Sequence, residues 1–225
     1  VFYTEDQCLR ICQTTLRAAV KKRMMTDRPA PIGCFLSGGF DSSIVAALLV
    51  EQLRNPKDLH TFSIGMAGAT DLKHAMDVAT YLGTTHHQII VTKEEMLDAI
   101  PTAIWHMETF DTTTIRAGTG MFLLSKWIQE HSKVRVVYSG EGSDELSGSY
   151  LYFRSAPSAV EYQKECLRLC EDLHRYDVLR ADQATAAAGL EVRVPFLDRQ
   201  FMSMYLHIDP ELRRPRDTGN GKLVE

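Results

Sequence analysis

The sequence predicts an α/β fold in which a doubly wound, mostly parallel sheet with flanking helices is followed by a helical half. Short β-rich segments alternate with amphipathic segments over residues 1–150, the pattern of strand–helix–strand units with right-handed crossovers. From residue 151 to residue 225 the patterns are helical. The 225 residues are enough for a sizeable core. We therefore expect an α/β core over 1–150 and a helical continuation of the same domain over 151–225.

The elements follow one another in a clear order. A capping box at Thr4 and Gln7 starts the first helix, which proline residues end before a strand at Ile32–Leu36. Asp71 is expected to cap the third helix, and Glu108–Arg116 is expected to be a polar loop. Further strands are expected at residues 60–66, 86–91 and 134–138, and further helices at 44–55, 71–83, 93–107, 118–131, 160–177, 181–189 and 200–207.

The first predicted strand runs into a loop that is suited to an anion. Its sequence, Ser37-Gly-Gly-Phe-Asp-Ser-Ser43, leads directly into a helix. Glycines let the backbone approach a ligand closely, and the N–H groups of a helix N-terminus favour negative charge. Serine hydroxyls add donors, and Asp41 could hold Mg²⁺ against phosphates. The lysine of a Walker A loop is missing, so the loop belongs to another kind of phosphate site.

A second loop, Ser139–Glu145, follows the predicted strand at 134–138. Parallel strands bring their carboxyl ends to one edge of a sheet, so both loops are expected to meet there. Anionic phosphates beside Glu141, Asp144 and Glu145 need a cation, and we expect Asp41 and Asp144 to approach a shared Mg²⁺. The alternative is that these acidic residues only favour a helix start.

Composition excludes several classes of protein. A net charge of -4 argues against a basic nucleic-acid surface, and the apolar runs are too short for a membrane span. Val1 and the residues after it form no signal peptide, so the chain is expected to be a cytoplasmic piece of a longer protein. Five cysteines argue against a disulfide framework. The C-x-x-x-C pairs Cys8/Cys12 and Cys166/Cys170 allow zinc, but packing as small apolar side chains is favoured.

Several strings together resemble the synthetase domain of the glutamine-dependent asparagine synthetases, in the ATP pyrophosphatase (PP-loop) superfamily. The match runs in order over essentially the whole chain. It implies an adenine nucleotide alpha-hydrolase-like fold and a two-step reaction with ATP and Mg²⁺. The aspartate β-carboxylate attacks the α-phosphate to give β-aspartyl-AMP and pyrophosphate, and ammonia then displaces AMP to give asparagine. The strings are Ser37–Ser43, Thr113–Arg116, Ser139–Glu145, Tyr150–Phe153 and Gly189–Asp198.

The resemblance also implies roles for single residues. Glu141 and Arg116 are the catalytic candidates, Glu141 for forming and using the adenylate. Thr113 and Arg116 are candidates for holding aspartate, since a guanidinium suits its α-carboxylate. Asp41 and Asp144 would hold the metal. The nucleotide contacts fall to Leu36 and Ile64 around the adenine nucleotide, Ser37, Gly38, Gly39, Asp41 and Ser42 at the pyrophosphate, and Ser139 and Gly140.

Three departures limit the resemblance. The family's glutaminase domain, normally in the same polypeptide, is not in this sequence, so ammonia is expected as the direct substrate. Gly148-Ser149 replaces the usual two glycines before Tyr150. The family's catalytic lysine is expected beyond Glu225, since Lys222 matches an earlier lysine, and the fragment is therefore expected to turn over poorly.

Two alternative functions remain open on the sequence alone. The first is a related PP-loop synthetase, of the β-lactam, GMP or NAD synthetase kind, and the second is an ATP-binding fragment without turnover. The oligomeric state is also open, and a homodimer is compatible with the sequence.

Overall fold

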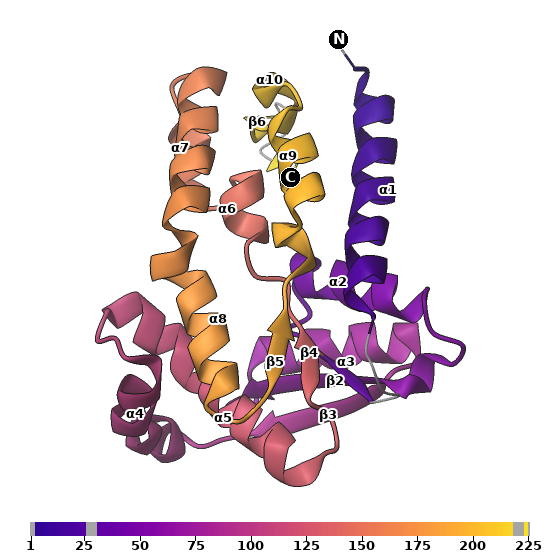
Figure 1. The fold of residues 1–225 in the computed structure, drawn as a ribbon. Coiled ribbons are helices and arrows are strands. Elements are labelled where there is room, and N and C mark those ends of the chain that lie inside the picture. Colours follow the sequence, from indigo (N-terminus) through magenta and orange to yellow (C-terminus); the bar gives the residue numbers. More distant parts are fainter. Residues whose placement is uncertain (1–2, 26–30, 218–222, 225) are drawn as a thin grey trace.

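The structure, a computed structural model, describes residues 3–25, 31–217 and 223–224. A five-stranded sheet lies at its centre with the order β3-β2-β1-β4-β5, and all four pairings are parallel (Figure 1). The chain order reverses between β1 and β4, so the predicted doubly wound fold is confirmed. The strands are β1 (Ile32–Phe35), β2 (Leu59–Gly65), β3 (Thr85–Ile90), β4 (Val136–Tyr138) and β5 (Glu191–Arg193).

Helices cover both faces of this sheet, and several rise above it in Figure 1. The α-helices are α1 (Glu5–Arg23), α2 (Phe40–Val50), α3 (Thr70–Leu82), α4 (Lys93–Met107), α5 (Thr112–His131), α6 (Ser143–Ser147), α7 (Ala159–Asp172), α8 (Asp177–Ala186), α9 (Arg199–Leu206) and α10 (Pro210–Arg213). Short 3-10 turns lie at Pro56–Asp58, Leu151–Ser155, Leu173–Arg175 and Pro195–Leu197, and β6 (Arg216–Asp217) pairs with β7 (Leu223–Val224).

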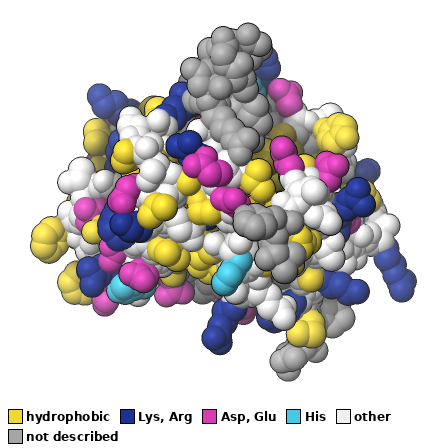
Figure 2. All heavy atoms as spheres, turned by 90° about the horizontal axis from the view of Figure 1, so that it is seen from above, with side chains coloured by type: hydrophobic (Ala, Val, Ile, Leu, Met, Phe, Trp, Pro, Cys, Tyr) yellow, Lys and Arg dark blue, Asp and Glu magenta, His cyan; other side chains and the backbone are white. Residues whose placement is uncertain are grey.

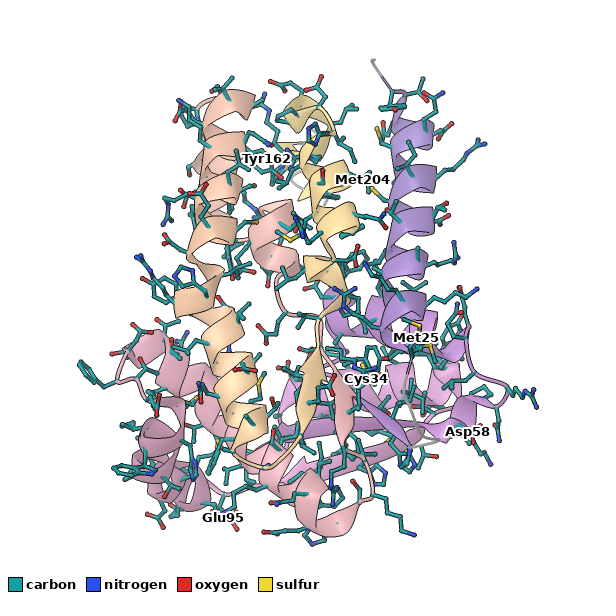
Figure 3. All side chains as sticks on the ribbon, in the orientation of Figure 1. Met25, Cys34, Asp58, Glu95, Tyr162 and Met204 are labelled. Carbon is teal, nitrogen blue, oxygen red and sulfur yellow. The ribbon has the colours of Figure 1, made fainter. Side chains whose placement is uncertain are left out.

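The central strand β1 is buried on both faces, which explains its uninterrupted apolar sequence. Cys34, labelled in Figure 3, and Leu36 face a cluster formed with α1, α2, α3 and α9. Phe35 faces the opposite cluster, which contains Phe62 and Ile128 of α5. The alternation of side chains along one strand thus attaches two layers of helices to the sheet.

Several predicted helix starts are wrong, since α2 begins at Phe40 instead of Ile44 and α8 at Asp177 instead of Ala181. The predicted loop at Glu108–Arg116 is largely helical. Helix α5 begins at Thr112 instead of Gly118, because the Asp111 side chain accepts a hydrogen bond from the Thr114 N–H at 2.8 Å and caps the helix. Ala69, not Asp71, is the N-cap of α3, and α2 ends at Val50 before the predicted end near Asn55. The capping box at Thr4 and the left-handed Gly83 that closes α3 are confirmed.

Residues 151–217 are not uniformly helical, because β5 adds an edge strand to the sheet. It pairs with β4 from Val136↔Glu191 to Tyr138↔Arg193. The sequence patterns predicted no strand here, since three residues with two charges leave little apolar signal.

Asp198, which follows β5, connects α9 to α1. Its carboxylate accepts hydrogen bonds from Arg23 at 2.8 Å and Lys22 at 3.2 Å and caps α9.

The described helices include none that is long and apolar enough to cross a bilayer. On the face in Figure 2, acidic, basic and apolar side chains are intermixed. Above the sheet, Tyr162 of α7 (labelled in Figure 3) is fully buried, and its hydroxyl donates to the Ser147 carbonyl oxygen. This bond fixes α7 against α6, the helix that follows the second loop.

The edge strand β3 should make stability depend on pH through His86. Its Nδ1 lies 2.9 Å from Thr61 Oγ1 and its Nε2 3.0 Å from Ser63 Oγ. Burial, with a smaller effect of neighbouring His87, lowers the pKa of His86 to about 4. The folded state therefore favours the neutral ring. Its contribution to stability is complete above pH 6.5, the ordinary pKa, and is lost as the pH falls from there toward 4.

We expect the free energy of unfolding to fall by about 1 kcal/mol between pH 7.5 and pH 5 because of His86, since its ring is only part-buried and solvent screens the effect. Urea unfolding at pH 7.5 and pH 5 would measure the loss in the parent chain and in His86→Gln. The variant should lose less between the two pH values. An equal loss in both chains would assign the pH dependence to other groups.

Candidate functional site

The loops after β1 and β4 lie in contact at the carboxyl edge of the sheet, on either side of the point where the chain order reverses. Ser143 Oγ, at the start of α6, donates a hydrogen bond to Asp41 Oδ1 at 2.6 Å. A Cβ added to Gly140 would lie 2.9 Å from the Cβ of Asp41 and from the Ser42 nitrogen. The two loops therefore pack backbone against backbone, as the parallel sheet requires.

Hydrogen bonds hold the first loop in one shape around the N-terminus of α2. The Ser37 N–H donates to Ser42 Oγ at 3.2 Å, and the Gly39 N–H donates to Ser37 Oγ at 3.2 Å. Gly38 has φ +81°, and a Cβ there would lie 2.5 Å from the backbone nitrogen of Ala75. Glycine is therefore required at position 38 for two separate reasons. The result is a rigid turn that presents serine hydroxyls and a helix N-terminus.

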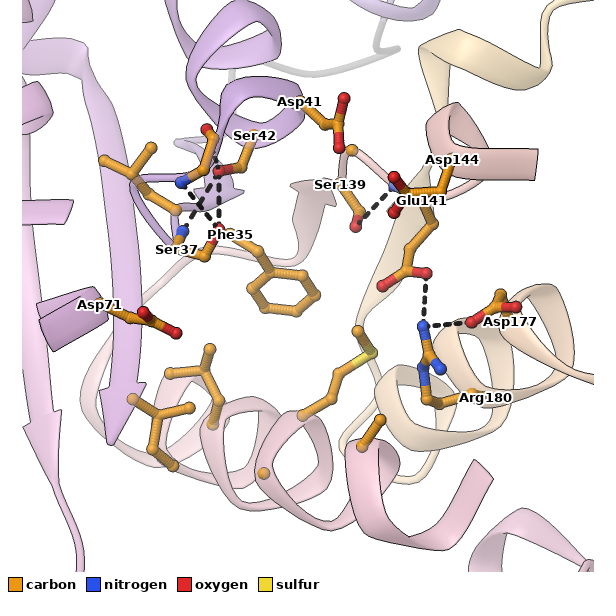
Figure 4. A pocket seen from close by; sticks show the side chains of 18 of the residues that line it. Phe35, Ser37, Asp41, Ser42, Asp71, Ser139, Glu141, Asp144, Asp177 and Arg180 are labelled. Carbon is orange, nitrogen blue, oxygen red and sulfur yellow. Dashed lines mark hydrogen bonds and ion pairs between the residues drawn. The ribbon is translucent and has the colours of Figure 1, made fainter. Parts of the chain in front are cut away.

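A cavity of about 530 Å³ opens in front of the two loops, bounded on its other sides by residues of α5 and α8 (Figure 4). Phe35 and Met121 give it apolar walls. The structure brings together all the site residues predicted from the sequence except Gly38, whose α-carbon faces α3. The predicted residues on the cavity wall are Leu36, Ser37, Gly39, Asp41, Ser42, Ile64, Thr113, Arg116, Ser139, Gly140, Glu141 and Asp144.

Glu141 is held at the cavity by a part-buried ion-pair network (Figure 4). Arg180 of α8 lies 2.6 Å from Glu141 Oε2 and 2.6 Å from Asp177 Oδ1, and its side chain is only 12% exposed. Burial raises the pKa of Glu141, and the Arg180 guanidinium opposes that rise. The network fixes one carboxylate oxygen of Glu141 and leaves Oε1 for another partner.

Thr113 and Arg116 lie on the first turns of α5, at the same cavity. Arg116 is exposed and forms no ion pair with any residue that the structure describes. Its guanidinium is thus available to an anionic group that enters the cavity. Because Asp111 caps the helix, the position of both side chains is set by helix geometry instead of by a loose loop.

Asp41 and Asp144 offer oxygen ligands suited to Mg²⁺. Both line the cavity, and each carboxylate also accepts a hydrogen bond from a serine, Ser143 for Asp41 and Ser149 for Asp144. Within the described ranges no three His, Cys, Asp or Glu side chains are grouped to hold a metal by themselves. Mg²⁺ is commonly bound by one or two carboxylates together with the phosphates of a substrate, so this pair fits such an ion.

Sequence reasoning missed several residues of the cavity wall, notably Asp177 and Arg180. Their only signal is an acidic and a basic residue three positions apart on a helix, a spacing that is common on solvated helix faces. Glu145 also lines the cavity; burial raises its pKa to about 7, the hydrogen bond from Tyr150 opposes this, and nearby Asp177 adds to it. Lys222 lies outside the described residues.

Comparison of the sequence with known proteins identifies the family of this chain. The asparagine synthase family model matches residues 12–165 and 156–224. Asparagine synthetase [glutamine-hydrolyzing] of Rattus norvegicus is 50% identical over 202 residues, which are 88% of this chain and 36% of the relative. The Homo sapiens protein of the same name is also 50% identical, over 88% of this chain and 36% of that relative. The chain thus spans about a third of the length of these relatives.

Among solved structures, the U34-tRNA thiolase NcsA from Methanococcus maripaludis matches with a TM-score of 0.49 and 15% identity, over 94% of this chain and 66% of that one. A likeness at this level says nothing about function. The family model and the 50% identity over most of the chain are sufficient to assign the family without this structural likeness. They confirm the resemblance drawn from the sequence motifs, and this chain belongs to the asparagine synthase family.

Proposed function

We propose that this chain carries out the ATP-dependent amidation of aspartate, with an adenylated side chain as intermediate. One observation carries the proposal. The bond between Ser143 and Asp41 joins a loop suited to an anion to an acidic loop around a single cavity, which the guanidinium of Arg116 also lines. The family supports it, because its members named above are asparagine synthetases.

The β1 end of the cavity suits ATP. Leu36 and Ile64 would provide apolar contacts for the adenine nucleotide, and Ser139 and Gly140 line the same cavity. Ser37, Gly39 and Ser42 present donors at the start of α2, where the pyrophosphate would bind, with Gly38 shaping the turn. Asp41 and Asp144 would hold Mg²⁺, which would neutralise phosphate charge when bound.

The α5 side of the cavity suits aspartate. Arg116 would pair with its α-carboxylate and Thr113 would add a hydroxyl, so that the side-chain carboxylate points to the nucleotide. Glu141 stands at the same cavity with Oε2 held by Arg180. Oε1 would accept a proton from the nitrogen nucleophile when ammonia displaces AMP.

The source of ammonia follows from the relatives, whose name states that they hydrolyse glutamine. We therefore assign this chain to the synthetase part, with the glutaminase part elsewhere in the natural protein. Two rivals remain testable: a PP-loop synthetase for another carboxylate, such as a β-lactam synthetase relative, and an ATP-binding module without turnover.

Exchange of labelled pyrophosphate into ATP, with Mg²⁺ and with or without aspartate, tests the proposal. Asp41→Asn keeps an oxygen for the Ser143 hydroxyl but removes the charge, and should lower aspartate-dependent exchange by roughly 100-fold. Asp58→Asn, exposed and remote from the cavity, is the control and should exchange like the parent chain.

Each rival predicts a different result. Exchange stimulated by another carboxylate and not by aspartate would identify a related synthetase. ATP binding without any exchange would identify a module without turnover. Either result would overturn the assignment to aspartate amidation.

A further inference from the structure

One oxygen of a buried carboxylate lacks a partner next to the proposed active site. Glu145 of α6 is 3% exposed. Its Oε1 accepts a hydrogen bond from the Tyr150 hydroxyl, whereas Oε2 receives no hydrogen bond from a donor among the described residues, and the carboxyl of Asp177 lies beside that of Glu145. A buried acceptor of this kind is costly unless something satisfies it, so it calls for a physical explanation.

The carboxylate of Glu145 lies where two cavities meet. Beside the main cavity is a smaller chamber of about 200 Å³, between the start of α5, the end of α7 and the start of α8. Thr113, Glu145, Tyr150, Asp177 and Arg180 line both spaces. A ligand bound at Glu145 would therefore stand beside the bound substrates without occupying their place.

The charges of the chamber favour a small cation. Asp111, Glu145 and Asp177 contribute carboxyl groups, and Arg180 is the only Lys or Arg among the described residues of its wall. Arg180 pairs with Glu141 and Asp177 through Nη2; its Nε has no partner among the described residues and makes no hydrogen bond to Glu145 Oε2. A volume of about 200 Å³ admits an ion the size of a water molecule together with a few waters, and is too small for a nucleotide.

We propose that this chamber is a binding site for ammonium, with Glu145 Oε2 as its principal acceptor. Ammonium donates hydrogen bonds in four directions, and the hydroxyl oxygen of Tyr150 is a further acceptor on the shared wall. The site would concentrate the nitrogen substrate beside the main cavity. This inference rests on the proposed function for its purpose, while the binding itself does not require turnover.

Glu145→Gln tests the proposal, because it keeps the shape of the side chain and removes its charge. Glu165→Gln is the matched control: the Glu165 carboxylate also accepts a tyrosine hydroxyl, from Tyr152 at 2.9 Å, but lies on α7 away from both cavities. With ATP and aspartate saturating, Glu145→Gln should raise the KM for ammonium about tenfold with little change in kcat, and Glu165→Gln should not. Equal KM values in all three chains would overturn the proposal.

Binding can be measured without turnover. The Tm of the parent chain and of Glu165→Gln should be higher in ammonium chloride than in sodium chloride of the same ionic strength, and this difference should vanish in Glu145→Gln. No difference in the parent chain, or the same difference in all three, would overturn the ammonium site. Failure of aspartate-dependent pyrophosphate exchange with the ammonium effect intact would instead reject only the proposed function.

Discussion

Alanine in place of Gly38 is expected to lower the free energy of unfolding by about 3 kcal/mol and to abolish ATP binding. The left-handed φ of +81° strains any residue with a Cβ, and that Cβ would lie 2.5 Å from backbone atoms of His74 and Ala75 in α3. Because backbone atoms cannot rotate away, the loop or the start of α3 has to move. Urea unfolding and nucleotide titration would measure the two effects.

Gly68→Ala separates the cost of the left-handed backbone from the cost of the contact between the new Cβ and the backbone of α3. Gly68 has φ +80°, almost the same angle, but no atom of the described residues lies within 4 Å of a Cβ built there. It should therefore cost only about 1 kcal/mol and leave ATP binding intact. Similar losses in the two variants would show that the close approach of α3 to the loop is unimportant.

Replacing Arg180 by methionine should destabilise the chain by about 3–5 kcal/mol and remove aspartate-dependent exchange. The change leaves Glu141 and Asp177 without the guanidinium that lies 2.6 Å from each. Two part-buried carboxylates would then repel each other, and Glu141 would lose its fixed orientation at the cavity. Urea unfolding and pyrophosphate exchange measure these losses separately.

The exposed Arg168 provides the comparison. It also contacts two carboxylates, those of Glu165 at 2.7 Å and Asp172 at 3.2 Å, but its side chain is 55% exposed. Arg168→Met should cost less than about 1 kcal/mol. In addition, Arg180→Met combined with Glu141→Gln should be more stable than Arg180→Met alone. Without such recovery, the unpaired charge of Glu141 would not be the cause of the loss.

The sequence predicted those parts of the site that local physics determines. An apolar run ending in Ser37-Gly38-Gly39 can be recognised as a strand, turn and helix start, and a parallel sheet then brings the loop at Ser139 to the same edge. The functional roles assigned to these residues remain predictions. The predictions from the sequence were wrong where one contact decides the local structure. The Asp111 side chain caps α5, so a polar stretch becomes helical, and β5 is a strand because it pairs with the edge of β4.

Arg180 is the clearest case of a site residue that the sequence does not predict. Its partner Glu141 lies 39 positions away in the chain, and nothing in the local pattern distinguishes it from the arginines of solvated helices such as Arg168. Only the fold shows that it is buried, and burial is what makes its ion pairs consequential.

The central place of β1 also affects how the chain is made. During synthesis β1 can pair with β2 early, since β2 begins at Leu59, but its other neighbour, β4, begins only at Val136. Until then the growing polypeptide exposes a row of unpaired N–H and C=O groups along its most apolar strand. Such an open edge invites pairing with other chains, so the interval before Val136 emerges is when the nascent protein most needs protection from aggregation.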